Sequence, residues 1–164
     1  MNAVTDRLPS DDELERLRRI NFGRLLDVVH VGFDRLALEL LRAAGYPAIR
    51  AAHTHVLRTM RAEGSTLTDM ADRAGISKQA MSKLVTEFEG MGFVEWREGR
   101  PRKVHTTSAG ITLLKHGVVA LERAEDAYFG DLSETEREAL RTLLLKIADG
   151  EDRGRDPDWR RRRA

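Results

Sequence analysis

A run of polar side chains between residues 77 and 86 has chemistry suited to reading a nucleic-acid duplex. Helical spacing places six of them on one outer face: Ser77, Lys78, Gln79, Ser82, Lys83 and Thr86. A glutamine amide can form two hydrogen bonds with adenine, a lysine ammonium can donate to guanine, and hydroxyls can bond phosphates or bases. A solvated helix also carries such a face, so this feature alone does not select DNA binding over simple exposure.

A tight turn precedes this face and joins two short helical patterns. Thr66 is predicted to cap the first helix, and Gly75 allows the turn. Ser77 caps the second helix, which continues to about Met91, and Gly92 suits a left-handed helix end. Two helices joined in this way form a helix-turn-helix, whose second helix can enter the major groove.

A basic hairpin follows. Residues 93–97 are predicted as a strand, 98–101 as a turn and 102–106 as the returning strand. Its candidate DNA contacts are Arg97, Arg100, Arg102 and Lys103. Arg100 follows Gly99 at the tip, where an arginine can enter a narrow minor groove. Charges on edge strands also deter aggregation, so we favour DNA contact for the tip arginine and leave it open for the strand arginines.

The N-terminal segment predicts one long helix. Ser10 and Glu13 form a capping box, and residues 14–44 contain no proline, with a bend expected at Gly23 or Gly32. Apolar side chains lie on more than one side of this helix, including Phe22, Leu26, Val29 and Phe33. A helix of this kind usually needs a partner chain to cover it.

The remaining helices have local start and stop signals. Pro47 suits the first turn of a second helix, which Gly64 closes. Thr107 is predicted to cap a helix after the hairpin. Ser133 begins a second capping box, and the last helix is expected to end at Gly150.

The composition excludes several classes of protein. The chain has 164 residues, of which 41% are hydrophobic and 34% charged, a net charge of +1 and no cysteine. Disulfides, thiolate metal sites and cysteine nucleophiles are therefore excluded. No apolar run approaches the roughly 20 residues that span a bilayer, and the N-terminus lacks a signal-peptide core, so we expect a cytoplasmic protein with no membrane partner.

Three segments together resemble the MarR family of bacterial regulators. The stretch LTDMADRAGISKQAMSKLVTEFEGMGFVEW, Leu67 to Trp96, is similar to the family's helix-turn-helix. GRPRKVHTTSAG, Gly99 to Gly110, is similar to its wing and the threonine-x-x-glycine that follows. Leu132 to Ile147 resembles its final helix.

The resemblance implies a mainly α (α+β) fold, a winged helix-turn-helix with a small β-ribbon wing and a helical dimerisation region. The expected organisation is 10–45 for an N-terminal dimerisation helix, 46–106 for the DNA-binding lobe, 107–150 for C-terminal dimerisation helices and 151–164 for a charged, disordered tail. It further implies a homodimer that represses genes from a pseudo-palindromic operator on double-stranded DNA. Many members release DNA when a small, often aromatic, ligand binds between dimer region and lobe.

The chain departs from the family pattern in two places. The wing is shorter than usual, and Glu98 stands where an aspartate is common, which puts minor-groove contact in question. Arg102 and Lys103 make the return strand more basic, which can compensate through phosphate contacts. The tail adds Trp159 and Arg160–Arg163, which either raise nonspecific DNA affinity or bind nothing.

A small-molecule effector is a further expectation. His30, Phe33 and Trp96 are candidates to line a pocket for an aromatic or anionic ligand, against the simpler interpretation that the two aromatic residues pack in the core. Metal-responsive regulation is an alternative because there are five histidines. However, His53 and His55 diverge by about 200° on a helix, so no metal site or cofactor is predicted.

Two other classes of protein are an enzyme and an interaction scaffold. The chain has no nucleophile elbow, P-loop or dinucleotide glycine motif, so we predict that it is not an enzyme. A dimeric interaction scaffold of the same fold, without DNA binding, is the other alternative. The polar face that carries Lys78, Gln79 and Lys83 argues against it, because a scaffold has no need of these three side chains together.

Overall fold

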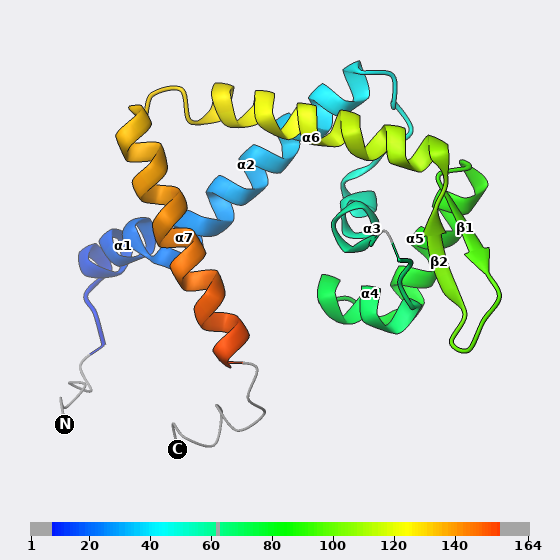
Figure 1. Ribbon diagram of the computed structural model, residues 1–164. Helices are drawn as coiled ribbons and strands as arrows, with labels where there is room; N and C mark the ends of the chain where they lie inside the picture. Colours follow the sequence, from blue (N-terminus) through cyan, green and yellow to red (C-terminus); the bar gives the residue numbers. More distant parts are fainter. Residues whose placement is uncertain (1–7, 62, 155–164) are drawn as a thin grey trace. The chain divides into compact units, whose positions relative to one another are not determined.

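The computed structural model describes residues 8–61 and 63–154 and is mainly helical, with one small antiparallel sheet (Figure 1). The elements are α1 (Asp11–Ile20), α2 (Phe22–Ala43), the 3₁₀ turn η1 (Ala51–His53), α3 (Thr54–Thr59), α4 (Leu67–Ala74), α5 (Lys78–Gly90), β1 (Val94–Arg97), β2 (Lys103–Thr106), α6 (Ser108–Tyr128) and α7 (Glu134–Gly154). Two compact units divide between Ala124 and Glu125, inside α6. The predicted fold class is confirmed. None of the described helices is both long and apolar enough to cross a bilayer.

The N-terminal segment is two helices rather than one, so the prediction of a single helix bent at a glycine was wrong. The break falls at Asn21, whose backbone is extended and whose side chain accepts a hydrogen bond from the Arg24 N–H at 3.2 Å. Asparagine is a strong N-cap, because its side chain satisfies a backbone donor that a helix start leaves unpaired. Gly23 and Gly32 lie within α2. The capping box of Ser10 and Glu13 begins α1 as expected.

The segment after α2 is less helical than Pro47 predicts. Turns occupy residues 44–45 and 47–48, and helical structure begins only at Ala51. The reason is the burial of Ile49, which is fully buried in the turn. Its N–H donates to the Tyr46 carbonyl at 3.1 Å, and its carbonyl accepts a hydrogen bond from Nε of Arg42 at 2.8 Å. The next helix ends at Thr59, before Gly64, so both predicted ends were wrong.

The helix-turn-helix and wing form as the local signals predict. Thr66 and Ser77 cap α4 and α5, and Gly75 between them has φ +66°. Strands β1 and β2 pair antiparallel, with Val94 opposite Thr106. An unpredicted bridge joins Ser65 to Val104, so the chain before α4 extends the small sheet.

A single apolar core holds this lobe together. It receives side chains from the end of α2, from the turn at Ile49, from α3 to α6 and from both strands, and its largest fully buried members are Phe88, Ile49, Met70, Met81 and Leu113. The start of α6 approaches the lobe closely, because a Cβ on Gly110 would lie 2.0 Å from the Phe93 carbonyl oxygen. Thr107 caps α6 by accepting the Gly110 N–H at 3.1 Å, as predicted, and donates to the Gly92 carbonyl at 2.7 Å.

The second unit holds the end of α6 and α7. A capping box of Ser133 and Glu136 begins α7 as predicted. Arg141 pairs with Glu125 at 2.6 Å. The helix continues to Gly154, past the end expected at Gly150, because one glycine costs a helix only about 1 kcal/mol. The predicted tail contacts at Trp159 and Arg160–Arg163 lie outside the described residues.

Candidate nucleic-acid interface

The outer face of α5 exposes the predicted side chains. Five of the six are exposed and Ser82 is half-buried. The side chains of Lys78, Gln79 and Lys83 form no hydrogen bond or ion pair with any other described residue, whereas the Thr86 hydroxyl donates to the Ser82 carbonyl at 3.0 Å. Three strong donors therefore project from the first half of the helix, where base edges are contacted in a major-groove complex.

The opposite face of α5 fixes this orientation. Met81, Leu84, Val85 and Phe88 are buried in the lobe core. Helix α4 packs beside α5, and the turn at Gly75 sets the angle between them. Because the apolar side is completely used, the polar side can only face outward.

The wing cations fall into two groups. Arg97 pairs with Glu95 at 2.8 Å, and Arg102 pairs with Glu98 at 3.3 Å while its guanidinium lies 4.5 Å from the centre of the Trp96 ring. Arg100 is exposed and Lys103 half-buried, and neither has an ion-pair partner among the described residues. Glu98 therefore holds Arg102 rather than the tip arginine.

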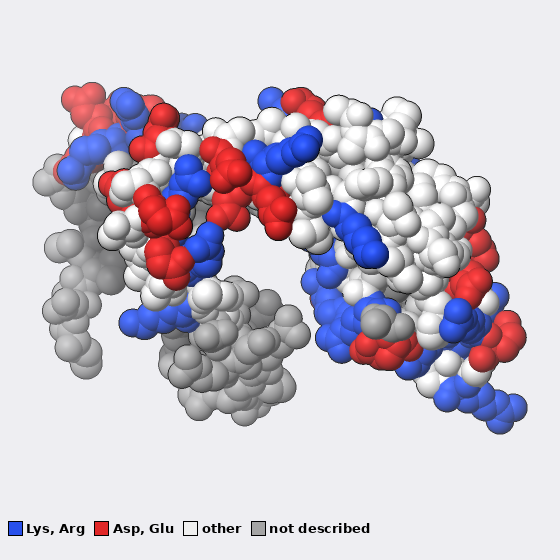
Figure 2. Space-filling model, turned by 45° about the horizontal axis from the view of Figure 1, so that its top comes forward, with Lys and Arg blue, Asp and Glu red and all other residues white. Residues whose placement is uncertain are grey.

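Charge on this part of the molecule is mixed. Figure 2 shows basic side chains along the lower part of the winged lobe, at the right of the view, with a few acidic side chains among them. A net charge of +1 for the whole chain is compatible with this local concentration, because DNA binding requires a basic surface rather than a basic protein.

The three predicted ligand residues lie on two elements. His30 is exposed on α2 with its Nε2 3.6 Å from Asp34, Phe33 is half-buried on the same helix, and Trp96 is half-buried in β1 beneath Arg102. None of these three residues lines the apolar pocket between α2, α3 and α6. Their role in ligand binding stays a prediction.

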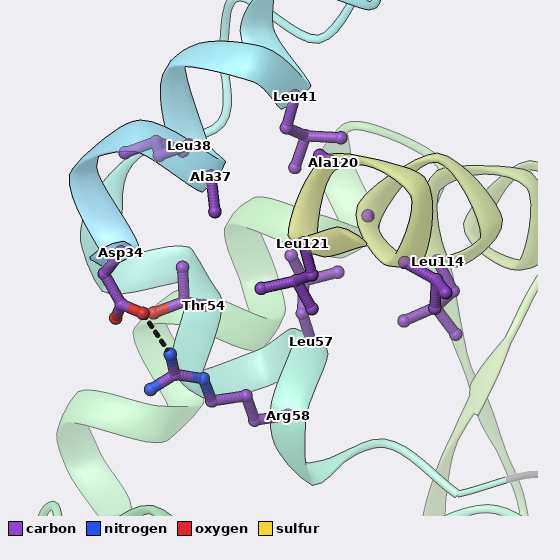
Figure 3. Close-up of a pocket in the computed structure, with 12 residues that line it drawn as sticks. Asp34, Ala37, Leu38, Leu41, Thr54, Leu57, Arg58, Leu114, Ala120 and Leu121 are labelled. Carbon is purple, nitrogen blue, oxygen red and sulfur yellow. Dashed lines mark hydrogen bonds and ion pairs between the residues drawn. The ribbon is translucent and has the colours of Figure 1, made fainter. Parts of the chain in front are cut away.

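An apolar pocket of about 220 Å³ lies where α2, α3 and α6 meet (Figure 3). Its walls are Ala37, Leu38 and Leu41 from α2, Thr54 and Leu57 from α3, and Leu114, Gly117, Val118, Ala120 and Leu121 from α6. Its charged groups are Arg58 and Asp34, which pair at 2.5 Å across the gap between α3 and α2. Sequence reasoning missed this site because no local pattern shows that these three helices meet.

Two of the described histidines form hydrogen bonds with side chains of other segments. His53 and His116 form hydrogen bonds with Glu87 and Tyr46, both at 2.7 Å. Residues 8–61 and 63–154 contain no group of three or more histidine, aspartate or glutamate side chains placed to hold a metal ion.

Known structures resemble this chain although sequences do not. No protein-family model matches it, and no curated protein is significantly similar in sequence. The oxidised MarR protein of E. coli is 23% identical, with a TM-score of 0.69 over 79% of this chain and 95% of that one. A MarR-family transcriptional regulator from Rhodococcus sp. RHA1 is 24% identical, with a TM-score of 0.67 over 78% and 92%.

A third structural neighbour is a protein whose DNA binding responds to a small molecule. Bordetella bronchiseptica BpsR, whose DNA binding is regulated by 6-hydroxynicotinic acid, is 21% identical, with a TM-score of 0.62 over 79% of this chain and 95% of that one. At these identities the likeness concerns the arrangement of the backbone. The chain thus has the winged helix fold of the MarR family of transcriptional regulators.

Proposed function

We propose that the protein is a MarR-family regulator that binds a specific double-stranded DNA operator as a homodimer, represses transcription there, and releases DNA when it binds a small aromatic or anionic ligand. The observation that carries the proposal is the exposed face of α5, where Lys78, Gln79 and Lys83 have no partner among the described residues. The rigid helix fixes the backbone from which these donors project, so binding has to order only the side chains themselves, at about 0.5–1.5 kcal/mol each. The structural neighbours are transcription regulators rather than enzymes, which agrees with a role without catalysis.

The apolar surface of the N-terminal helices supports the homodimer. Nine large apolar side chains between residues 14 and 31 are exposed: Leu14, Leu17, Ile20, Phe22, Leu25, Leu26, Val28, Val29 and Val31. A monomer rarely exposes so much contiguous apolar surface. A second copy related by a two-fold axis would cover it, and two-fold symmetry implies a pseudo-palindromic operator with half-sites about one helical turn apart.

Within the wing, the proposal assigns the tip contact to Arg100. Arg97 and Arg102 are held by glutamates, so each would have to exchange a carboxylate for a phosphate on binding. Exposed ion pairs are worth less than about 1 kcal/mol, so this exchange is affordable but gives little net affinity. Lys103, which has no described partner, is the better phosphate contact on the return strand.

In vitro selection from a random duplex pool tests DNA binding, symmetry and half-site spacing together. We expect an enriched pseudo-palindrome. On that site, Lys78→Ala should lower affinity about tenfold, whereas Gln79→Ala and Lys83→Ala should also relax base preference. Lys115→Ala removes an exposed lysine from α6 and is the matched control. If no sequence is enriched, a non-DNA-binding scaffold of the same fold becomes the better explanation.

The pocket between α2, α3 and α6 supports ligand control. Its apolar walls suit an aromatic ring, and the Arg58 guanidinium can pair with a carboxylate. A bound carboxylate would compete with Asp34 for Arg58 and so remove a bridge between α2 and the lobe. The regulation of BpsR by an aromatic acid agrees with a ligand of this class.

Titration of aromatic carboxylic acids into the protein–DNA complex tests this part. We expect release by at least one acid, and loss of that release in Arg58→Gln. Arg35→Gln, an exposed arginine of α2 without an ion-pair partner among the described residues, is the control. Unchanged DNA affinity across a broad panel would contradict ligand control, and a response to added Zn²⁺ instead would favour the metal-responsive alternative.

A further inference from the structure

A buried histidine connects the turn η1 to the recognition helix α5. The residue is His53, which is 2% exposed. Its ring packs edge-on against Phe88, with centroids 5.2 Å apart, and its Nε2 lies 2.7 Å from Oε2 of Glu87 on the same helix. Glu87 follows Thr86, the last residue of the candidate DNA-reading face. Glu87 is also four residues after Lys83, so helical spacing places it at the edge of that face beside Lys83.

The hydrogen bonds define the tautomer of the ring. The backbone N–H of Arg50 points at Nδ1 of His53 at 3.2 Å. A backbone N–H can only donate, so Nδ1 must be the acceptor and the ring proton must be on Nε2. That proton is directed at the Glu87 carboxylate, and a neutral ring satisfies both partners.

Arg50 completes the arrangement. Its guanidinium forms an ion pair with the same oxygen of Glu87 and lies 3.2 Å from Nε2 of His53. The hydrogen bond from His53 lowers the pKa of Glu87 from its ordinary value; burial opposes this shift, and Arg50 adds to it. The His53 ring and the Arg50 guanidinium thus both donate to the Glu87 carboxylate of α5, and the positive charge of Arg50 balances the negative charge of Glu87.

We propose that His53 and Arg50 act through Glu87 as positioning residues that set the rotation of the recognition helix about its own axis. Burial of its apolar side chains turns the polar side of α5 outward, but hydrophobic contacts are not directional and leave small rolls of the helix to be set by polar contacts. A roll of about 10° would move a side-chain tip about 6 Å from the helix axis by about 1 Å. The usual range of hydrogen-bond lengths spans only about 0.5 Å, so base recognition requires the rotation to be held more tightly than this.

This inference rests on the proposed DNA binding, and its test begins with the operator that the wild-type protein selects. Failure of the wild type to select any site would refute DNA binding itself. The measured quantity is the ratio of affinity for the selected site to affinity for a scrambled duplex. In Glu87→Gln we expect this ratio to fall about tenfold, with less than a twofold change in scrambled-site affinity and an unchanged salt slope.

Glu89→Gln is the matched control, because it removes the same charge from the same helix at an exposed residue whose side chain forms no hydrogen bond or ion pair with another described residue. Arg50→Gln, which alters no residue of α5, should lower the same ratio to a similar extent as Glu87→Gln, and the double variant should be no worse than the worse single variant. All ratios are compared at a temperature where each variant is folded by circular dichroism.

Two results would overturn the inference. The first is a ratio in Glu87→Gln within twofold of that in Glu89→Gln. The second is a loss in Glu87→Gln that Arg50→Gln does not reproduce, which would mean that Glu87 contacts the DNA directly. A purely structural role predicts lower melting temperatures with an unchanged ratio, and that outcome also counts against positioning.

Discussion

The winged lobe and the N-terminal helices contain similar apolar residues but use them differently. In the lobe, Phe88, Met81 and Val85 are fully buried against side chains of the same chain. Helix α1 has no buried residue, and α2 buries only Ala37, Leu38 and Leu41, all in its C-terminal half. The lobe thus has its own core, whereas the first half of the N-terminal segment has a helix surface and no core. This contrast indicates that the lobe folds on its own contacts, whereas the apolar surface of the helices is left for the proposed second copy to cover.

The strongest test of this contrast compares two phenylalanines. Phe88 is 0% exposed and Phe22 is 83% exposed. Phe88→Ala should lower the free energy of unfolding by about 4 kcal/mol, because it removes buried contacts and leaves a cavity. Phe22→Ala should change it by less than about 0.5 kcal/mol at low protein concentration. Urea unfolding measures both, and equal losses would contradict a separate lobe core.

The next test compares two glycines of α6. Gly110→Ala should destabilise the lobe by about 3 kcal/mol, because its Cβ would lie 2.0 Å from the Phe93 carbonyl oxygen. Gly117→Ala is the control, since a Cβ there meets no atom within 4 Å, and it should leave stability unchanged or slightly raised. Thermal melting reports both changes. A tolerated Gly110→Ala would mean that α6 does not pack on the wing as closely as described.

A third test addresses the uncovered helices. The double substitution Leu25→Glu and Val28→Glu places two charges on exposed apolar positions of α2. We expect the dimer dissociation constant to rise about 100-fold, because charges at a buried interface would lack partners. Arg24→Glu changes the net charge equally without removing apolar surface. Sedimentation measures association, and a dimer unaffected by the double substitution would place the interface elsewhere.

The smallest expected effect is on acid stability. The pKa of Glu87 is lowered from 4.5 in the folded lobe, chiefly by its hydrogen bond from His53. Ionised Glu87 therefore stabilises the lobe above about that pH, and the stabilisation is lost as the pH falls through the lower folded value. The melting-temperature difference between wild type and Glu87→Gln should be largest near neutrality and shrink toward pH 3.

The capping box of α1 provides the corresponding comparison. Hydrogen bonds from the Ser10 backbone and side chain lower the pKa of Glu13. Glu13→Gln should loosen α1 alone and leave the melting of the lobe unchanged at every pH, because α1 contributes no side chain to the lobe core. If the melting temperature of the lobe depended on pH in the same way in Glu13→Gln as in Glu87→Gln, α1 and the lobe would not be separate.

Local signals predicted the helix-turn-helix closely. Thr66, Gly75 and Ser77 act on their own backbone neighbours, so their effect is visible without knowledge of distant residues. The same reasoning failed at residues 44–60, where burial of Ile49 overrides the helix start that Pro47 suggests. It also missed the bridge between Ser65 and Val104, because pairing across 39 residues of chain leaves no local trace.

The sequence by itself determined where α4, α5 and the wing begin and end, and which polar side chains share the outer face of α5, since caps and helical periodicity act within a few residues. Only the tertiary structure decided which apolar faces are covered: Leu25 and Leu38 occur in one helix, yet one is exposed and the other buried. It also decided that His53 meets Glu87 and that Arg58 meets Asp34. Such pairs depend on how the packed helices approach one another, and that is a property of the whole lobe's core rather than of any short segment.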